Sequence, residues 1–139
     1  MPAVVLDAFA LLAWLQDEPG AERVEAYLAE ASVGRAQVLI SAINLGEVYY
    51  LLARRQAGAT AEALWQDLRR GRVPLRAVPA TWSRVRAAAR LKARFPISYA
   101  DAFAAALALE RSAPLVTGDP EFGPLERGAG LQVVWLAGP

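Results

Sequence analysis

The sequence of 139 residues contains no cysteine and no histidine. The absence of cysteine excludes disulfides, thiolate zinc sites and cysteine nucleophiles. The absence of histidine excludes a Ser-His catalytic triad, imidazole metal ligands and an imidazole base. If the chain is an enzyme, its chemistry therefore falls to carboxylates, whose oxygen atoms suit Mg²⁺ or Mn²⁺.

Long apolar runs and a strong charge imbalance are also missing. No stretch suits a transmembrane helix and the N-terminus lacks a signal-peptide pattern, so we expect a cytoplasmic protein with no membrane segment. The net charge is +1, which means that any nucleic-acid-binding surface must be local. With 55% hydrophobic residues, the length suits one globular domain over residues 1–139.

Short apolar strands alternate with helices along the chain. Strands are expected at residues 3–7, 38–41, 75–78, 115–117 and 131–135, and helices at 8–16, 21–31, 43–58, 61–70, 81–92 and 99–110. Gly58 is expected to stop one helix and Thr60 to cap the next. The fold class is therefore α/β, with a mainly parallel central sheet of four to five strands flanked by helices.

Four acidic residues stand within or directly after apolar segments, namely Asp7, Glu47, Asp101 and Asp119. Carboxylates are rarely taken out of water unless they are paired or bind a metal. Asp7 and Asp119 follow predicted strands, while Glu47 and Asp101 lie in the first turns of helices. All four therefore belong to the carboxyl end of the sheet, where open parallel sheets bind their ligands.

Carboxylates that lie close together need a counter-charge, because their mutual repulsion raises at least one pKa. We therefore predict a site for Mg²⁺ or Mn²⁺, with Asp7 and Asp101 as the main direct or water-mediated ligands. Glu47 and Asp119 would complete the site, orient a water molecule or hold a second ion. Such a site suits in-line hydrolysis of a phosphodiester, which needs neither histidine nor cysteine.

Each acid also has a purely structural explanation. Asp101 lies three residues after Ser98 and can complete a capping box. Asp119 precedes a proline and can be an ordinary helix N-cap, and Asp7 can cap the helix that follows it. Glu47 can lie on a narrow exposed stripe of its helix and point into solvent. The combination favours a common site, because the structural explanations require four coincidences at one end of one sheet.

The four acids lie in short motifs. These are Val4-Val5-Leu6-Asp7, the segment 41–48 that carries Glu47, Tyr99-Ala100-Asp101-Ala102, and Leu115-Val116-Thr117-Gly118-Asp119. In this order and spacing they resemble the motifs of a PIN domain, and the chain resembles a VapC-type toxin ribonuclease over essentially its whole length. The resemblance implies a Mg²⁺- or Mn²⁺-dependent endoribonuclease acting on RNA, a homodimer, and inhibition by a cognate VapB-type antitoxin.

The resemblance maps the active site onto the four acids, as metal ligands and catalytic residues, and we add Thr117, Asn44 and Ser98 as supporting residues. It implies that Thr117 holds the carboxylate of Asp119 by a hydrogen bond. The family often has Thr or Ser directly after the first Asp, where this chain has Ala8, and the lost hydroxyl can weaken metal binding. The alternative function is therefore a catalytically weak PIN-like module that binds protein or RNA.

Basic residues gather in three segments. Arg84, Arg86, Arg90, Lys92 and Arg94 share one predicted helix and its exit, and smaller clusters lie at 54–55 and 69–72. These side chains can contact RNA phosphates, pair with surface acids or pair with carboxylates of an antitoxin. The four tryptophans, like Tyr49 and Tyr50, are expected in the core or at a dimer interface.

Overall fold

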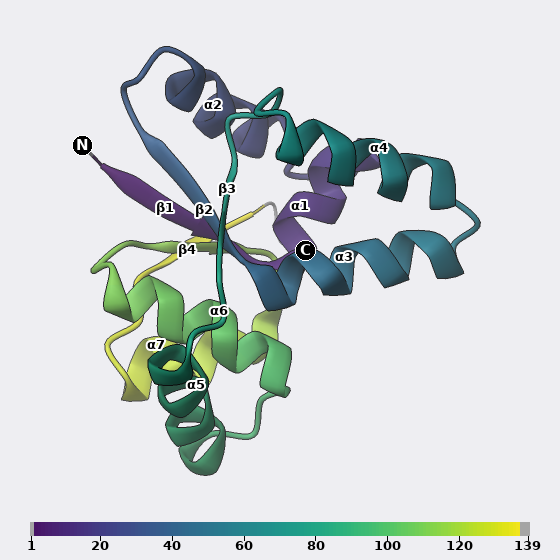
Figure 1. Cartoon of the computed structure of the whole chain (residues 1–139). Helices are drawn as coiled ribbons and strands as arrows, with labels where there is room; N and C mark the ends of the chain where they lie inside the picture. Colours follow the sequence, from purple (N-terminus) through teal and green to yellow (C-terminus); the bar gives the residue numbers. More distant parts are fainter. Residues whose placement is uncertain (1, 137–139) are drawn as a thin grey trace.

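A parallel sheet of five strands runs through the centre of the fold, in the order β3-β2-β1-β4-β5 (Figure 1). The structure is a computed structural model that describes residues 2–136. Within these residues the strands are β1 (Ala3–Leu6), β2 (Gln37–Ser41), β3 (Arg76–Val78), β4 (Leu115–Thr117) and β5 (Val133–Trp135). The predicted α/β class and parallel sheet are confirmed.

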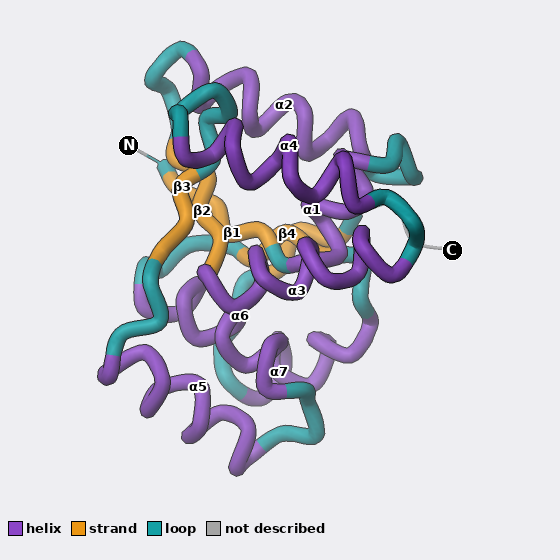
Figure 2. Tube along the Cα trace, turned by 45° about the vertical axis from the view of Figure 1, so that its right-hand side comes forward, coloured by secondary structure: helices purple, strands orange, loops and turns teal. Residues whose placement is uncertain are grey.

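Helices cover both faces of this sheet (Figures 1 and 2). They are α1 (Ala8–Leu15), α2 (Ala21–Ser32), α3 (Ala42–Arg54), α4 (Gly58–Arg69), α5 (Trp82–Arg94), α6 (Tyr99–Glu110), the 3₁₀ helix η1 (Pro120–Phe122) and α7 (Gly123–Gly128). Helices α1 to α4 pack on one face, and α5 to α7 pack on the other. Within residues 2–136, no helix combines the length and the hydrophobicity needed to cross a bilayer.

The central strands β1, β2 and β4 are mostly apolar because successive side chains enter two different cores. Leu6 and Ile40 join the core beneath α1 to α4, whereas Val5 and Leu39 join the core beneath α5 to α7. All four side chains are fully buried, and each contributes roughly 1.5–3 kcal/mol by leaving water. The sheet is therefore held rigidly between two layers of helices, which fixes the positions of the residues that follow its strands.

The strand order reverses between β1 and β4. The chain first builds outward from β1 through β2 to β3, and then returns to the other side of β1 for β4 and β5. In the β1–β4 pair, Leu6 lies opposite Val116. The residues that come just after these two strands, Asp7 and the segment 117–119, therefore meet at the carboxyl edge, at the switch point where such sheets bind ligands.

One helix boundary differs from the prediction. Gly58 was expected to stop α3 but instead begins α4. The left-handed residue after α3 is Gln56, with φ of 60°, and the amide of Ala57 closes the helix end on the carbonyl of Leu52 at 2.8 Å. Thr60 consequently lies inside α4 and does not cap it. The prediction was wrong because it gave the left-handed position to the nearest glycine.

The aromatic residues are less buried than expected. Trp82 is 90% exposed, and Tyr50 and Trp65 are 45% and 39% exposed. For these three residues the core alternative is wrong, and the interface alternative stays a prediction. Trp14 and Trp135 are partly buried and pack against the two cores. An indole left in water at the start of α5 contributes nothing to folding by burial.

Candidate metal centre

Asp7 is the most deeply buried of the four acids, with 2% of its surface exposed. It directly follows β1, and its Oδ1 accepts a hydrogen bond from the amide of Ala10 at 2.9 Å, which caps α1. Its Oδ2 accepts a second hydrogen bond from the hydroxyl of Thr117 at 2.5 Å. The capping role suggested by the sequence is real, but the second bond also fixes the carboxylate against β4.

Thr117 connects the two acids that follow the central strands. Its hydroxyl donates to Asp7 and its Oγ1 accepts from the amide of Asp119 at 3.0 Å. The expected bond to the carboxylate of Asp119 is therefore not made, because the register of β1 and β4 brings the Asp7 side chain to Thr117 first. Ala8 is buried and offers no hydroxyl, yet Asp7 still receives a hydroxyl donor, from Thr117.

Glu47 is half-buried and lies on α3 one turn after the fully buried Asn44. The Nδ2 of Asn44 donates to Glu47 Oε1 at 3.4 Å and to the carbonyl of Ala100 at 3.0 Å. Because Ala100 immediately precedes Asp101, Asn44 ties α3 to the first turn of α6. Within residues 2–136, Asn44 Oδ1 is the one buried side-chain polar atom without a hydrogen-bond partner.

Asp101 lies in the first turn of α6. Its amide donates to the hydroxyl of Ser98 at 3.1 Å, so Ser98 caps the helix as predicted. The reciprocal bond of a capping box, from the amide of Ser98 to the Asp101 carboxylate, is not found among the described residues. The Asp101 carboxylate therefore lacks that backbone bond; a hydrogen bond with the Ser98 side chain lowers its pKa, and burial and the neighbouring acids raise it.

Those other acids follow β4. Asp119 caps η1 by accepting the amide of Glu121 at 2.9 Å. One carboxylate oxygen from each of Asp101, Asp119 and Glu121 lies within 4.8 Å of the other two. Glu121 was missed from the sequence, where its only signal is its position two residues after Asp119 in a tight turn.

The acids are close enough to disturb one another's ionisation. Burial is the main cause that raises the pKa of Asp7 to about 7, and the charges of Asp101 and Asp119 add to it against two opposing hydrogen bonds. Burial and the neighbouring Asp119 and Glu47 raise the pKa of Asp101 to about 6. The pKa of Glu47 is raised as well, by burial and by Asp119. The charges of the four predicted acids therefore act on one another, while the carboxylates within 4.8 Å of one another are those of Asp101, Asp119 and Glu121.

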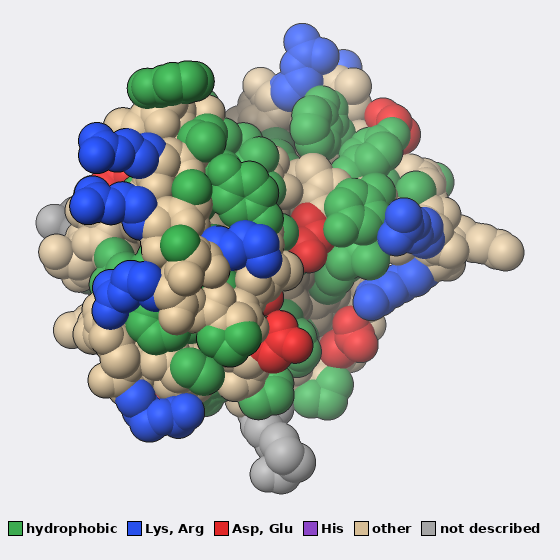
Figure 3. Space-filling view, turned by 90° about the horizontal axis from the view of Figure 1, so that it is seen from below, with side chains coloured by type: hydrophobic (Ala, Val, Ile, Leu, Met, Phe, Trp, Pro, Cys, Tyr) green, Lys and Arg blue, Asp and Glu red, His purple; other side chains and the backbone are tan. Residues whose placement is uncertain are grey.

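This group has the chemistry that a hard divalent cation requires. Its side-chain donors are carboxylate oxygens, which Mg²⁺ and Mn²⁺ prefer. Among residues 2–136, no arginine or lysine forms an ion pair with any of the four acids. In the space-filling view, acidic side chains gather near the middle of one face, with most lysines and arginines toward its margins (Figure 3). The residues present therefore fit a metal ion.

Gly118, between Thr117 and Asp119, allows the ring of Phe9 to lie close against the main chain. A Cβ atom at this position would lie 2.3 Å from the ring of Phe9, well inside van der Waals contact. The ring of Phe9 is 43% exposed and lies two residues after Asp7. The close approach therefore places a partly exposed aromatic ring beside both strand-end acids.

The chain matches a known protein family. The sequence pattern of the PIN domain family matches residues 4–127, and the chain belongs to this family. The predicted resemblance is thereby confirmed. Comparison with curated proteins gives no match.

Solved structures of similar fold cover nearly the whole chain. VapBC2 from Rickettsia felis, bound to a promoter DNA fragment, is 18% identical with a TM-score of 0.73, over 97% of this chain and 99% of that chain. DNA-bound VapBC from Salmonella typhimurium is 21% identical with a TM-score of 0.72, over 96% and 98%. VapC20 of Mycobacterium tuberculosis, a sarcin-ricin loop cleaving toxin, is 20% identical with a TM-score of 0.71, over 90% and 95%. At these identities the likeness is one of fold.

Proposed function

We propose that the chain is a metal-dependent endoribonuclease, the toxin of a toxin–antitoxin pair, which hydrolyses RNA phosphodiesters. The observation that carries the proposal is the group of acids at the switch point of the sheet, which have no basic partner among the described residues. Burial and neighbouring carboxylates raise the pKa values of Asp7, Glu47 and Asp101. Membership of the PIN domain family supports it. The likeness to VapC20, a sarcin-ricin loop cleaving toxin, gives further support.

The cofactor we propose is Mg²⁺ or Mn²⁺, held by Asp7, Glu47, Asp101 and Asp119. When bound, such an ion supplies positive charge that activates water for attack on phosphorus and offsets the negative charge of the transition state. The two hydrogen bonds to Asp7 hold its carboxylate in one orientation, so ligand geometry is set before binding.

The remaining side chains position the reactants. Asn44 fixes Glu47, which leaves the second carboxylate oxygen of Glu47 available to orient the attacking water. Thr117 fixes the main chain of Asp119 relative to Asp7. Ser98 fixes the first turn of α6 and so directs the carboxylate of Asp101 toward the centre.

We further propose a homodimer that acts in the cytoplasm and is inhibited by a VapB-type antitoxin. Support for the antitoxin comes from similar folds solved as toxin–antitoxin complexes, among them one from Klebsiella pneumoniae with 15% identity and a TM-score of 0.64. The alternative, a weak binding module, rested on Ala8. It loses much of its basis because Thr117 supplies Asp7 with a hydroxyl donor.

The direct test is RNA cleavage by the purified protein with Mg²⁺, with Mn²⁺ and with a chelator, in parallel with an Asp7→Asn variant. We expect cleavage that needs the ion and is lost in the variant. Calorimetric titration with Mn²⁺ separates the two functions. Saturable binding without cleavage of any RNA would favour the module, and equal cleavage by wild type and variant would exclude the mechanism.

A further inference from the structure

The outward face of α5 carries a line of three exposed side chains. Trp82, Arg86 and Arg90 are spaced by four residues, so they lie on the same side of the helix, about 6 Å apart along its axis. We refer to these three residues as the α5 stripe. The helix contains no acidic residue, so nothing within α5 neutralises these charges.

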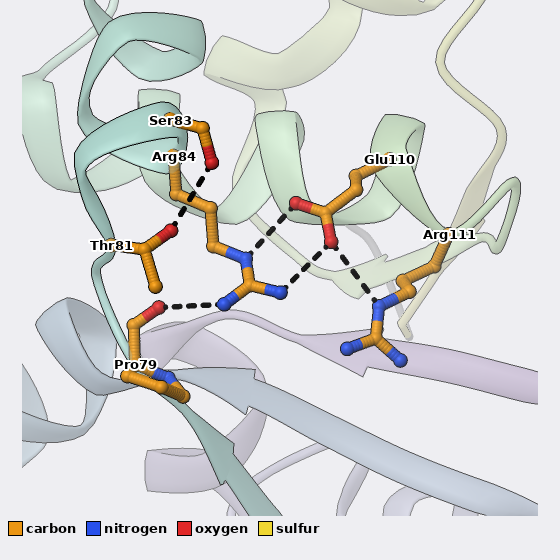
Figure 4. Close-up of polar contacts among 6 residues, drawn as sticks. All are labelled: Pro79, Thr81, Ser83, Arg84, Glu110 and Arg111. Atoms are coloured by element: carbon orange, nitrogen blue, oxygen red, sulfur yellow. Dashed lines mark hydrogen bonds and ion pairs between the residues drawn. The ribbon is translucent and has the colours of Figure 1, made fainter.

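The structure divides the basic residues of α5 into two groups. Arg84 donates to both carboxylate oxygens of Glu110 at 3.0 Å and to the carbonyl of Pro79, so it is part of the fold (Figure 4). Lys92 is also occupied, since it donates to the carbonyl of Ile97 at 2.9 Å. Arg86 and Arg90, by contrast, have no hydrogen bond or ion pair within residues 2–136. Their guanidinium groups are therefore available to a ligand.

Trp82 completes the stripe with a different chemistry. It is 90% exposed, the highest value among the large exposed hydrophobic side chains of the described residues. Its flat apolar face gains free energy only if something covers it. Arginines combined with a solvent-facing aromatic ring are the combination that binds single-stranded nucleic acid, through phosphates and through base stacking. A protein partner can also bind arginine and tryptophan, so the experiment below includes it as an outcome.

The position of α5 relates the stripe to the acidic centre. A loop of four residues joins the end of α5 at Arg94 to the start of α6 at Tyr99, and Asp101 lies in the first turn of α6. α5 is the lowest helix of Figure 1 and therefore faces the viewer in Figure 3. There, lysine and arginine side chains lie along one side of the face that carries the acids. An extended strand that reaches the acids can thus continue along α5.

We propose that the α5 stripe binds the single-stranded RNA that flanks the cleaved bond, with phosphates on Arg86 and Arg90 and a base stacked on Trp82. This inference rests on the proposed ribonuclease function. It assigns the substrate a path away from the acidic centre, along the outer layer of the α5–α7 side of the sheet.

The test measures binding of a fluorescent single-stranded RNA oligonucleotide by anisotropy between 50 and 200 mM salt, the range over which phosphate contacts dominate. All proteins carry Asp101→Asn, so that turnover does not interfere. Replacing Arg86 and Arg90 by Gln together should reduce the slope of log affinity against log salt by about 1.4, the value for two phosphate contacts to a single strand. Trp82→Ala should weaken binding about 5- to 100-fold, and Trp82→Phe should retain most of it.

The matched control removes the same charge elsewhere. Arg35 and Arg76 are exposed and lie at the amino ends of β2 and β3, away from the carboxyl edge that holds the acids. Replacing both by Gln should leave the salt slope and the affinity within about twofold of the parent. Equal losses in the control and in the stripe variant would overturn the proposal, because net charge alone would then explain them.

Other outcomes also support or overturn the proposal. Unchanged RNA affinity in the stripe variants overturns the proposal in favour of a protein partner for this face. A change of molecular mass on Trp82→Ala in size-exclusion chromatography overturns it in favour of a subunit interface. RNA binding that needs the stripe in a protein with no cleavage activity supports the stripe and refutes the ribonuclease. Metal-dependent cleavage that the stripe variants do not change, for long and short RNAs alike, supports the ribonuclease and refutes the stripe.

Discussion

The pKa values of carboxylates shift in opposite directions in the acidic centre and at the contact between α5 and α6. Glu110 is held between Arg84 and Arg111, and the bond from Arg84 is the main cause that lowers its pKa (Figure 4). Asp7, by contrast, is buried beside other acids, and its pKa is raised to about 7. The first arrangement supplies the counter-charge from within the fold. The second leaves the counter-charge to be supplied from outside the fold, as the proposed metal site requires.

The contrast has an energetic meaning. A carboxylate beside arginines gains from ionisation, so the folded protein favours its charged form. Ionisation of a carboxylate beside other carboxylates raises the free energy of the folded state. Without a cation, the folded protein is therefore less stable than it would be with neutral side chains. Proteins keep such unfavourable groups where they serve binding or catalysis. The four predictions below test this difference, beginning with the largest expected effect.

Asp101→Asn should lower the rate of RNA cleavage in Mg²⁺ or Mn²⁺ by at least about 100-fold, because loss of a direct ligand costs more than loss of a residue that only supports one. Glu110→Gln is the matched control on the same helix, and it should change the rate less than twofold. Both rates come from cleavage of one RNA under single-turnover conditions. Comparable losses in the two variants would remove the distinction between the two regions.

Asp7 should make the metal-free protein less stable as the pH rises. Its pKa is 3.8 when unperturbed and about 7 in the folded protein, so the folded state binds more protons between these values. The free energy of unfolding must therefore fall as the pH rises from about 4 to about 7, by at most about 4 kcal/mol from this group.

The measurement is urea unfolding in a chelator at several pH values, with wild type and Asp7→Asn side by side. The variant should be the more stable protein at pH 8 and similar at pH 4, and its dependence on pH should be shallower. Adding Mn²⁺ should stabilise the wild type more at pH 8 than at pH 5, because protons compete with the ion. Parallel pH curves for wild type and variant would contradict the assigned role of burial.

Thr117→Val should destabilise the metal-free protein by about 1–3 kcal/mol, because it removes a hydrogen bond to a buried carboxylate and leaves the amide of Asp119 without its acceptor. The valine has nearly the same shape, so packing is preserved. Thr117→Ser keeps the hydroxyl and should recover most of the loss. Urea unfolding at pH 8 measures all three proteins, and equal stability of the valine variant would rule out an important bond.

Glu110→Gln should have the smallest effect, a loss of at most about 1 kcal/mol in the free energy of unfolding. Its ion pairs with Arg84 and Arg111 are partly exposed and therefore screened by solvent. The loss should shrink as salt is raised from 50 to 500 mM. A loss that persists unchanged at high salt would mean that the hydrogen bonds, rather than the charges, hold α5 against α6.

The sequence predicts the parts of this protein that depend on local pattern. The buried strands, the capping by Ser98 and the positions of the four acids follow from apolar runs and from helix-start chemistry. The common location of Asp7 and Asp119 follows from one further rule, that parallel strands end at the same edge. These features were predicted because each is determined within a few residues along the chain.

The features that were missed depend on contacts between distant segments. The partner of Thr117 is set by the register of β1 against β4, which no local pattern contains. The left-handed turn at Gln56 and the exposure of Trp82 are likewise results of how helices pack. Glu121 joins the acids only because η1 turns it back toward α6. Sequence patterns locate the site, and tertiary packing determines its details.

The bond between Asp7 and Thr117 joins residues 110 positions apart. During synthesis on the ribosome, Asp7 is therefore translated long before the strand that carries its partner. The centre cannot assemble until β4 has been made, and fragments that stop before β4 lack it altogether. Strand order alone thus delays formation of the acidic centre in a nascent chain.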